Sequence, residues 1–323
     1  MDGRVVNAGV ADDGAVDGRV VDPLLRDWCR RWLGASPAAV AFAGGNLSRV
    51  VGLHLDDGQA VAVKIRPPHP RLRGCATVQE HLWRRGYPCP EPLAGPEPLG
   101  ERAATAERLV PGGEPLADPG SHAGRFAAAL ADLIGLAPAL AAVPDLSPPP
   151  PWVRWDHAQA GVWPRPLSSP DLNANLTPVW LDDVAARVRA LLRRHGDGAR
   201  PVVGHADFES QNMRWTGDRL HVVHDWDSVA GRPEAVLVGA AAAAFPATGA
   251  TAVAATVQQS AAFVDHYEAA RGRSLSAADR AAAWAAGLWV LAYNAAVECV
   301  EGGGPLLGCV ADQVAERMRR AGL

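Results

Sequence analysis

The strongest constraint on this chain comes from one short segment, residues 203–228, which reads VGHADFESQNMRWTGDRLHVVHDWDS. It carries a carboxylate at Asp207, an amide five residues later at Asn212, and a second carboxylate thirteen residues further on, at Asp225. The largely apolar stretch before Asp225 predicts a short strand that places this residue. Three polar groups on one hairpin-sized segment can face the same small volume, and this favours a chemical role for them.

Phosphoryl transfer from ATP needs positioned charge more than covalent helpers. It uses a carboxylate that takes the proton of the acceptor hydroxyl, and oxygen ligands for Mg²⁺. The catalytic loop of kinases has the same spacing of five between an Asp and an Asn, followed by a later metal-binding Asp. Asp207, Asn212 and Asp225 match that template in order and spacing. The structural alternative is a polar hairpin with incidental acids, because Asp and Asn are common in turns.

The segment resembles the aminoglycoside phosphotransferase and choline kinase group of the protein-kinase-like superfamily. Members of that group carry His-Gly-Asp, four residues and Asn, and then a strand that ends in Ile-Asp-Trp. This chain has His-Ala-Asp ending at Asp207, then Asn212, and later His-Asp-Trp around Asp225. The resemblance implies that Asp207 is the catalytic base, that Asn212 and Asp225 are Mg²⁺ ligands, and that His205 holds the loop.

A single lysine fits the same scheme. Lys and Arg together number 31, and Lys64 is the only lysine, so the other 30 are arginines. Such a composition suggests that ordinary surface lysines have been replaced by arginine and that position 64 needs an ammonium group. Lys64 ends the apparent strand Val-Ala-Val-Lys, and in a kinase-like small lobe it would bind the α- and β-phosphates and pair with a helical glutamate, here Glu80.

Two further stretches resemble the nucleotide-binding parts of the family. The turn Gly-Gly-Asn-Leu-Ser, which contains Gly45 and Ser48, is similar to the phosphate-covering loop. The stretch Glu-Arg-Leu-Val-Pro-Gly-Gly, which contains Glu107 and Leu109, is similar to the connector between lobes, whose backbone meets adenine. The resemblance implies ATP, with GTP as the alternative, and Mg²⁺ as cofactors.

The pattern of elements predicts an α+β, two-lobed protein-kinase-like fold, with a small antiparallel β-sheet N-lobe of five strands and a larger, mainly helical C-lobe. Strands are predicted at 40–43, 49–55, 59–65, 91–94 and 103–109, and two more lie within the segment 203–228. Helices are predicted at 22–33, 75–85, 121–142, 178–195, 252–271 and 277–300. The predicted division is a loosely ordered N-terminus at 1–20, a nucleotide-binding N-lobe at 21–110 and a catalytic, acceptor-binding C-lobe at 111–323.

Composition excludes several partner classes. The net charge of −4 and the absence of basic tracts argue against nucleic acid or an anionic membrane as a partner. The five scattered cysteines indicate reduced thiols and a cytoplasmic protein, and the N-terminus lacks a signal-peptide pattern. The longest apolar run, 281–297, is shorter than the ~20 residues that span a bilayer, so a buried helix is predicted. The oligomeric state is not indicated.

Two other functional classes compete with a kinase. A haloacid-dehalogenase-type phosphatase is suggested by the strand that ends in Asp225-Trp-Asp227, but such enzymes use a lysine downstream of the nucleophile, and Lys64 lies upstream. A nucleotide-binding pseudokinase or regulatory module is the second alternative, although the polar set of a kinase is complete. A hydrolysis or phosphoryl-transfer assay distinguishes the pseudokinase from an active kinase.

The acceptor is an open question at the level of sequence. The resemblance favours a hydroxyl of an aminoglycoside or macrolide-like antibiotic, and hence antibiotic resistance; the alternative is a metabolite such as choline, a sugar or an amino alcohol. A cationic acceptor would need carboxylates beside aromatic faces. The candidates for such a patch are Asp227, Glu234, Glu298, Glu301, Trp284, Trp289 and Tyr293. A macrolide would instead need an apolar groove between C-terminal helices.

Overall fold

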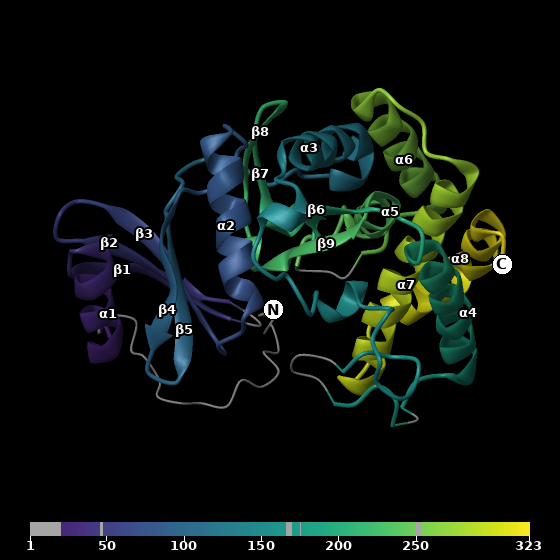
Figure 1. The fold of residues 1–323 in the computed structure, drawn as a ribbon, viewed down its shortest axis with the longest axis horizontal. Coiled ribbons are helices and arrows are strands. Elements are labelled where there is room, and N and C mark those ends of the chain that lie inside the picture. Colours follow the sequence, from purple (N-terminus) through teal and green to yellow (C-terminus); the bar gives the residue numbers. More distant parts are fainter. Residues whose placement is uncertain (1–20, 46–47, 166–169, 175, 250–252) are drawn as a thin grey trace, which may run out of the picture. The chain divides into compact units, whose positions relative to one another are not determined.

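The computed structural model describes residues 21–45, 48–165, 170–174, 176–249 and 253–323. These residues form two compact units (Figure 1). Unit 1 contains the described residues up to Pro67 together with residues 93–109, and unit 2 contains residues 68–92 and the chain from Val110 onwards.

Unit 1 is a five-stranded antiparallel sheet with one helix. The helix, α1 (Pro23–Leu33), begins where the side chain of Asp22 accepts a hydrogen bond of 2.8 Å from the backbone N–H of Leu24, and it ends at Gly34 in the left-handed conformation. The strands have the order β1-β2-β3-β5-β4. Their bounds are β1 Pro37–Gly44, β2 Arg49–Leu55, β3 Ala60–Arg66, β4 Pro92–Leu99 and β5 Arg102–Arg108. The predicted strands and the turn at Gly58 are thereby confirmed.

The two faces of this sheet differ because successive side chains of a strand point to opposite sides. On one face, residues such as Val51, Val61 and Val63 are at most 3% exposed and pack with Leu25 and Trp28 of α1. The other face carries the alternate residues, which include Lys64. Burial of the first face against α1 therefore determines the direction in which the lysine points.

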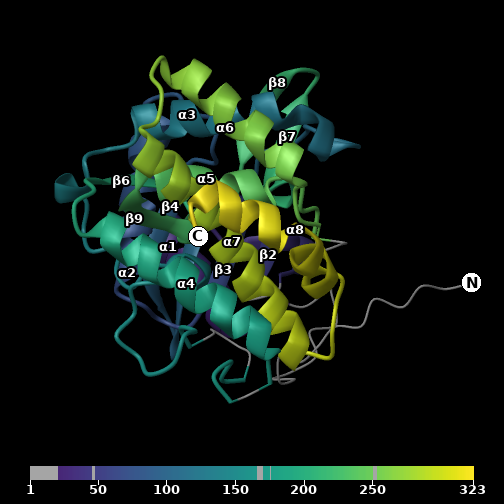
Figure 2. The same ribbon diagram turned by 90° about the vertical axis from the view of Figure 1, so that its right-hand side faces the viewer.

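Unit 2 is mainly helical. Its helices are α2 (Arg71–Arg84), α3 (Ala123–Leu136), α4 (Val179–Gly196), α5 (Glu234–Ala244), α6 (Val257–Arg271), α7 (Ala277–Val300) and α8 (Leu306–Ala321). Its strands form two antiparallel pairs, β6 (Pro201–His205) with β9 (Val229–Pro233), and β7 (Met213–Thr216) with β8 (Arg219–Val223). One apolar cluster joins α2, α3 and α6 to the strand pairs, and a second joins α4, α7 and α8, which lie side by side in Figure 2.

Helices α5 and α7 approach each other very closely. A Cβ added to Gly239 would lie 1.9 Å from the carbonyl oxygen of Ala283, so only glycine fits at this contact. The rest of α5 is buried on all sides and consists mainly of alanine and valine. A helix that is buried all round has no amphipathic period, and this explains why α5 is not among the helices predicted from the sequence.

Helix α7 has the predicted bounds, Ala277–Val300, and extends beyond the apolar run 281–297 at both ends. Within the described residues it is the one helix long and apolar enough, by length and composition, to cross a membrane. However, 72% of its most apolar window is buried inside the fold, and Trp289 at its centre is fully buried. Packing of this kind is that of a core helix, as the sequence indicated.

The predicted division places helix α2 in the N-lobe, residues 21–110, whereas in the structure α2 is part of unit 2. Its residues Cys75, Val78 and Leu82 belong to the same apolar cluster as Phe126 and Trp226 of unit 2. The guanidinium of Arg71 also donates to the backbone carbonyls of Asp227 and Val229. Residues 68–92 therefore belong to unit 2, because α2 buries its apolar face there.

Candidate active site

The two strand pairs of unit 2 bring the predicted catalytic residues together. Strand β6 pairs with β9 and strand β7 pairs with β8, so the loop from β6 to β7 runs beside the turn from β8 to β9. Two backbone hydrogen bonds join them: the N–H of Ala206 donates to Ser228 O at 2.9 Å, and the N–H of His224 donates to Asn212 O at 2.8 Å. The first loop carries Asp207 and Asn212, and the second carries Asp225.

Asn212 is held in a defined orientation by Asp207. Its Nδ2 donates to the backbone oxygen of Asp207 at 2.9 Å and to Oδ2 of Asp207 at 2.9 Å. Both amide hydrogens are thereby used, so the oxygen Oδ1 is the atom that remains to coordinate a cation. The pair is partly buried, whereas neighbouring Phe208 and Met213 are fully buried and anchor the loop.

Asp225 has an unusual backbone. Its φ of 65° lies in the left-handed region, and it is the one non-glycine residue with positive φ among those the structure describes. Asp tolerates this conformation better than branched residues do, and such outliers are frequent at functional sites. The hydroxyl of Ser228 donates to Asp225 Oδ2 at 2.9 Å, and the backbone N–H of Ser228 donates to its carbonyl at 3.0 Å. The turn therefore fixes the direction of the carboxylate.

His205 holds the two loops together. Its Nδ1 accepts from the backbone N–H of Asp207 at 3.2 Å, and its Nε2 donates to the carbonyl of His224 at 3.1 Å. Burial lowers the pKa of His205, although the carboxylate of Asp225 acts in the opposite direction. The ring of Trp226 packs edge-on against His205 at 5.6 Å between centroids. His205 therefore acts as a neutral structural residue.

Glu209 is an additional acid inside the loop. It is 8% exposed, and its Oε2 accepts a hydrogen bond of 2.5 Å from Nε2 of Gln211. Burial raises the pKa of Glu209 well above its ordinary value of 4.5, and the negative charges of Asp207 and Asp225 raise it further. Because protonated Glu209 is neutral, the loop does not carry a third negative charge close to Asp207 and Asp225.

This burial predicts a stabilising substitution. The unfolded chain ionises Glu209 above about pH 4.5, whereas the folded protein keeps it protonated, so the free energy of unfolding falls as the pH rises from there towards the raised pKa. Glu209→Gln removes this loss and keeps an oxygen that accepts from Gln211. We expect the melting temperature of the variant to match wild type near about pH 4.5 and to exceed it by a few degrees near about pH 8.

Thermal denaturation across this pH range measures the effect. The matched control is Glu101→Gln, at an exposed turn of unit 1, which should follow wild type at every pH. A Glu209→Gln variant whose advantage over wild type does not grow with pH would contradict the assignment of a protonated Glu209.

In unit 1, one row of residues crosses the face that carries Lys64. Phe42 of β1 lies opposite Gly52 of β2, Gly52 opposite Ala62 of β3, and Ala62 opposite Glu107 of β5. The Phe42 ring covers Gly52 so closely that a Cβ added to Gly52 would lie 2.2 Å from the ring. Phe42 is nevertheless 44% exposed. Lys64 lies two residues along β3 from this row, and on the same face.

The other predicted nucleotide-binding residues are also placed in unit 1. Gly45 has a φ of +117°, and a Cβ there would lie 1.9 Å from the carbonyl oxygen of Ser48, so the predicted turn requires glycine. The central residues of that turn, Asn46 and Leu47, lie outside the described residues. The backbone N–H of Leu109 donates to the carbonyl of Ala60 at 2.9 Å, which ties the start of the connector to β3.

Glu80 lies on α2, in the other unit from Lys64. Its Oε1 lies 2.6 Å from the guanidinium of Arg84, one helical turn further on, and about half of the Glu80 side chain is exposed. The pairing of Glu80 with Lys64 stays a prediction.

A family model decides the assignment. The model of the phosphotransferase enzyme family matches residues 38–284, which is most of the chain. The chain belongs to this family. It is therefore a phosphotransferase that acts on hydroxyl groups, with a protein-kinase-like fold. The comparison with curated proteins gives no match.

Solved structures of this fold include three relatives of low sequence identity. A putative fructosamine-3-kinase from Thermobifida fusca has 18% identity and a TM-score of 0.58, over 91% of this chain and 98% of that one. An amicoumacin kinase has 12% identity and a TM-score of 0.56, over 87% and 88%. The aminoglycoside phosphotransferase APH(4)-Ia has 15% identity and a TM-score of 0.54, over 92% and 96%. At these identities the likeness establishes the fold. The assignment to a phosphatase of the haloacid dehalogenase type is thereby excluded.

The donor set of this phosphotransferase suits a metal that arrives with a nucleotide. Within the described ranges, no group of three or more His, Cys, Asp or Glu side chains is placed to hold a metal ion. Asn212 and Asp225 are one amide and one carboxylate, which are hard oxygen ligands. Mg²⁺ keeps several waters and is commonly bound by one or two carboxylates together with phosphate oxygens. The two residues fit that mode of binding.

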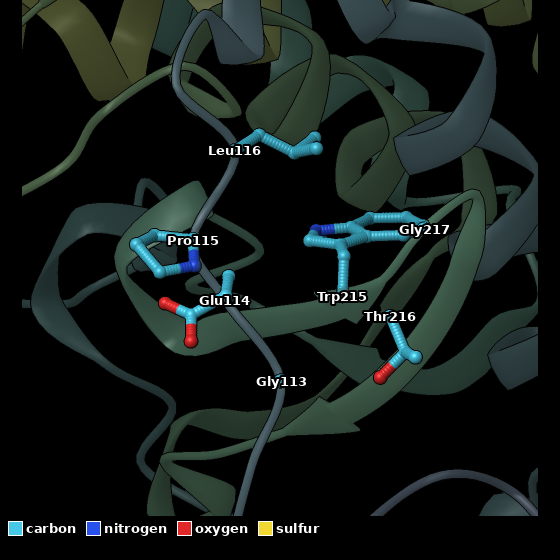
Figure 3. A pocket seen from close by; sticks show the side chains of 7 residues that line it. All are labelled: Gly113, Glu114, Pro115, Leu116, Trp215, Thr216 and Gly217. Carbon is cyan, nitrogen blue, oxygen red and sulfur yellow. The ribbon is translucent and has the colours of Figure 1, made fainter.

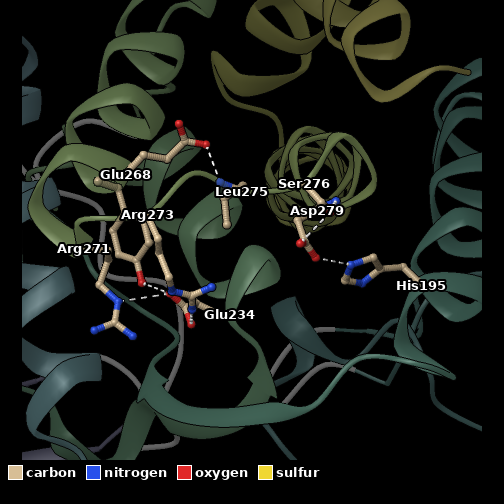
Figure 4. A network of polar contacts seen from close by, with 9 residues as sticks. His195, Glu234, Glu268, Arg271, Arg273, Leu275, Ser276 and Asp279 are labelled. Carbon is tan, nitrogen blue, oxygen red and sulfur yellow. Dashed lines mark hydrogen bonds and ion pairs between the residues drawn. The ribbon is translucent and has the colours of Figure 1, made fainter.

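Five of the residues considered for a cationic acceptor, namely Glu234, Glu298 and the three aromatic residues, do not form an open patch. The carboxylate of Glu234 accepts from Tyr267 Oη at 2.7 Å and from Arg271 Nε at 3.2 Å, and it also pairs with Arg273 (Figure 4). Glu298 accepts from the backbone N–H of Leu306 at 2.8 Å. The aromatic candidates are at least 92% buried, as the exposed fractions of Trp284 (8%), Trp289 (0%) and Tyr293 (4%) show. The contacts of Glu234 and Glu298 are structural, and the aromatic faces are covered by the surrounding core.

A separate pocket lies beside the segment that follows the connector. It has a volume of about 300 Å³ and is lined by residues 113–116 and 215–217 (Figure 3). The backbones of Glu114 and Trp215 exchange two hydrogen bonds of 2.8 Å beneath it. Trp215 and Met213 share the apolar cluster of α3, whereas Asn212 is half-buried and bonded to Asp207. The lining contains none of the predicted site residues.

Phe42 and Glu209 are not among the functional residues predicted from the sequence. The sequence does show that Phe42 is an aromatic residue in a predicted strand of otherwise small side chains. It does not show that Phe42 lies opposite Gly52, because that pairing depends on the register between two strands. Glu209 is one more acid in an acidic loop, and only its burial sets it apart.

Proposed function

We propose that this phosphotransferase moves the γ-phosphate of ATP to a hydroxyl group of a small molecule, an antibiotic or a related compound. The observation that carries the proposal is the convergence of Asp207, Asn212 and Asp225 on two adjacent loops, joined by hydrogen bonds through Asn212 and His205. The solved amicoumacin kinase contains AMP-PNP and Ca²⁺, and one solved form of APH(4)-Ia contains AMP-PNP and hygromycin B. These complexes support a nucleotide and a divalent cation here.

Each residue has a defined task in this proposal. The carboxylate of Asp207 accepts the proton of the acceptor hydroxyl as the hydroxyl oxygen attacks the γ-phosphorus of ATP, and the bond from that phosphorus to the bridging oxygen breaks to release ADP. Asn212 Oδ1 and the Asp225 carboxylate hold Mg²⁺, which when bound neutralises charge on the phosphates. Lys64 binds the nucleotide phosphates, and the pairing with Glu80 positions its ammonium group.

Unit 1 would supply the remaining nucleotide contacts. Gly45 and Ser48 belong to the phosphate-covering turn, and Glu107 and Leu109 offer backbone groups to the base. Phe42 presents an exposed ring on the Lys64 face, and a ring in that position is suited to stack on a purine. The free cysteines support a reducing, cytoplasmic setting.

Phe42→Ala is expected to raise the KM for ATP about 5- to 100-fold, because stacking of a base on an aromatic side chain is worth about 1–3 kcal/mol. Phe42→Tyr should retain ATP binding close to wild type. Steady-state kinetics with varied ATP measures both. Trp32→Ala, which removes an exposed aromatic side chain from α1 of the same unit, is the matched control. A Phe42→Ala enzyme with a normal KM for ATP would exclude the ring as a base-stacking residue.

The decisive experiment is a transfer assay. Purified protein is incubated with Mg²⁺, [γ-³²P]ATP and a panel of hydroxyl compounds that includes hygromycin B, choline and simple sugars. We expect label to appear in at least one acceptor and to disappear with Asp207→Asn. ATP binding without any transfer or hydrolysis would instead assign the chain to the pseudokinase class.

A further inference from the structure

A segment after the proline-rich connector lies directly beside the catalytic loop. The indole Nε1–H of Trp152, in the short helix Pro151–Val153, donates to the carbonyl oxygen of Ala206 at 3.0 Å. Ala206 is the residue before Asp207, the proposed base. Arg154 follows Trp152 by two residues. The segment that carries Arg154 is therefore a direct neighbour of the residue assigned as the base.

Arg154 is a partly buried cation that forms no ion pair with a carboxylate among the residues the structure describes. Its Nη2 donates to the backbone carbonyl of Arg165 at 3.2 Å, while its Nε–H is buried and has no acceptor among the described residues. Burial lowers the pKa of Arg154, yet a guanidinium stays charged under physiological conditions. A desolvated charge with an unused donor is costly unless a partner arrives.

The acid closest in sequence is already engaged. Both oxygens of Asp156 accept from Arg232, at 2.6 and 2.7 Å, and the Arg232 guanidinium also lies 4.3 Å from the centre of the Trp155 ring. This is a bidentate pair held in place by an aromatic face, the strong form of such contacts. Both oxygens of Asp156 are therefore occupied by Arg232, although the negative charge of Asp156 still acts to raise the pKa of Arg154.

Tyr293 of α7 adds a second donor beside Arg154. The residue is 4% exposed, and its ring packs edge-on against Trp163 at 6.4 Å between centroids. Burial raises the pKa of Tyr293, and the positive charge of Arg154 acts against that rise. Val153 and Trp155, which flank Arg154, belong to the same apolar cluster as Tyr293. The segment of Arg154 therefore packs with that of Tyr293, and the guanidinium and the phenol both offer N–H or O–H donors.

The surroundings are predominantly cationic. Arg189 donates to the carbonyls of Trp155 and His157 at 2.7 Å each, and Arg193 donates to the carbonyl of His157 at 2.7 Å. Burial lowers the pKa of His69, and the charges of Arg71 and Arg154 lower it further. One acid, Glu301 at the end of α7, acts on Tyr293 and raises its pKa.

We propose that Arg154 and Tyr293 bind a carboxylate of the phosphoryl acceptor, which is thus a hydroxy acid and not a polycationic aminoglycoside. The inference rests on the proposed function. A carboxylate accepts from both donors at once, and it supplies the negative charge that the cluster of arginines lacks.

Matched acceptors test the charge preference. D-Gluconate, D-glucose and D-glucosamine share a six-carbon polyol skeleton and carry a carboxylate, no charge and an ammonium group respectively. ADP release and labelled product are measured for each, together with hygromycin B. We expect kcat/KM for gluconate to exceed that for glucosamine by about 10- to 100-fold, the range for one charge-assisted hydrogen bond. Arg154→Met should raise the KM for gluconate by a similar factor, and Tyr293→Phe by less.

The variants carry their own controls. Arg194→Met, on the exposed face of α4, should leave the KM for gluconate unchanged, and Arg154→Lys should retain part of the affinity if Arg154→Met does not fold. Two results overturn the carboxylate assignment and keep the proposed function. One is preferred transfer to glucosamine or hygromycin B, and the other is a KM for gluconate that neither Arg154→Met nor Arg154→Lys changes. Absence of transfer to every acceptor, with no ATP hydrolysis that depends on Asp207, overturns the proposed function itself.

Discussion

Asp207→Asn is expected to lower kcat about 10²–10⁴-fold, the usual contribution of a general base, while the KM for ATP stays within a few-fold of wild type. The amide cannot accept the proton of the acceptor hydroxyl. It does keep an oxygen for the 2.9 Å bond from Asn212 Nδ2, so the loop should retain its conformation. Steady-state kinetics with the best acceptor measures kcat and the KM for ATP. A thermal denaturation curve tests whether the variant keeps its fold.

Asp218→Asn is the matched control for this change. Asp218 lies in the turn between β7 and β8, its side chain is 90% exposed, and it pairs with Arg125. The same chemical change there should leave kcat within about two-fold of wild type, since exposed pairs contribute little. If Asp207→Asn retained kcat within a few-fold of wild type, a different residue would be the base.

Asp225→Asn is expected to abolish detectable turnover and to weaken binding of Mg·ATP strongly. Removal of the carboxylate charge takes away a principal metal ligand. The fold should survive, because Asn adopts the left-handed conformation of residue 225 as readily as Asp, and its oxygen can accept the 2.9 Å bond from the Ser228 hydroxyl. Titration calorimetry with Mg·ATP is the direct measurement, and removal of the metal with EDTA should reproduce the loss of turnover in the wild type.

Asp265→Asn on α6 serves as the control for Asp225→Asn, because its side chain is 66% exposed and pairs with Arg280. It should bind Mg·ATP like wild type. Equal affinity of Asp225→Asn and wild type for Mg·ATP would show that Asp225 is not a metal ligand.

The two proposed roles are separated by what each variant loses. Asp207→Asn should bind Mg·ATP and fail to transfer, whereas Asp225→Asn should fail at binding. This contrast follows from the proposed roles: Asp207 takes a proton from the acceptor, whereas Asp225, which its own turn places through Ser228, is proposed to hold the metal that accompanies ATP. A double variant should therefore resemble Asp225→Asn alone in nucleotide affinity.

Much of the fold could be predicted from local patterns. The strand Arg49–Leu55 and the helix Ala277–Val300 have the predicted bounds, because a hairpin turn at Gly58 and a helix start at Ser276 are encoded by nearby residues. The strand pair β6 and β9 could not be predicted, since its partners are separated by more than twenty residues and each is only five residues long. Helix α8 is also absent from the sequence-based assignment, although its apolar residues Leu306, Val310 and Met318 follow a helical period.

The sequence by itself determined the chemistry: Asp207, Asn212 and Asp225 have an order and spacing that few chains share, and the single lysine marks a position on the third strand. Only the tertiary structure decided how these groups are oriented. The orientation of Asn212, the burial of Glu209 and the missing partner of Arg154 depend on contacts between residues distant in sequence. Spacing along the chain records which groups are present, whereas hydrogen-bond partners and desolvation arise only when separate segments pack together.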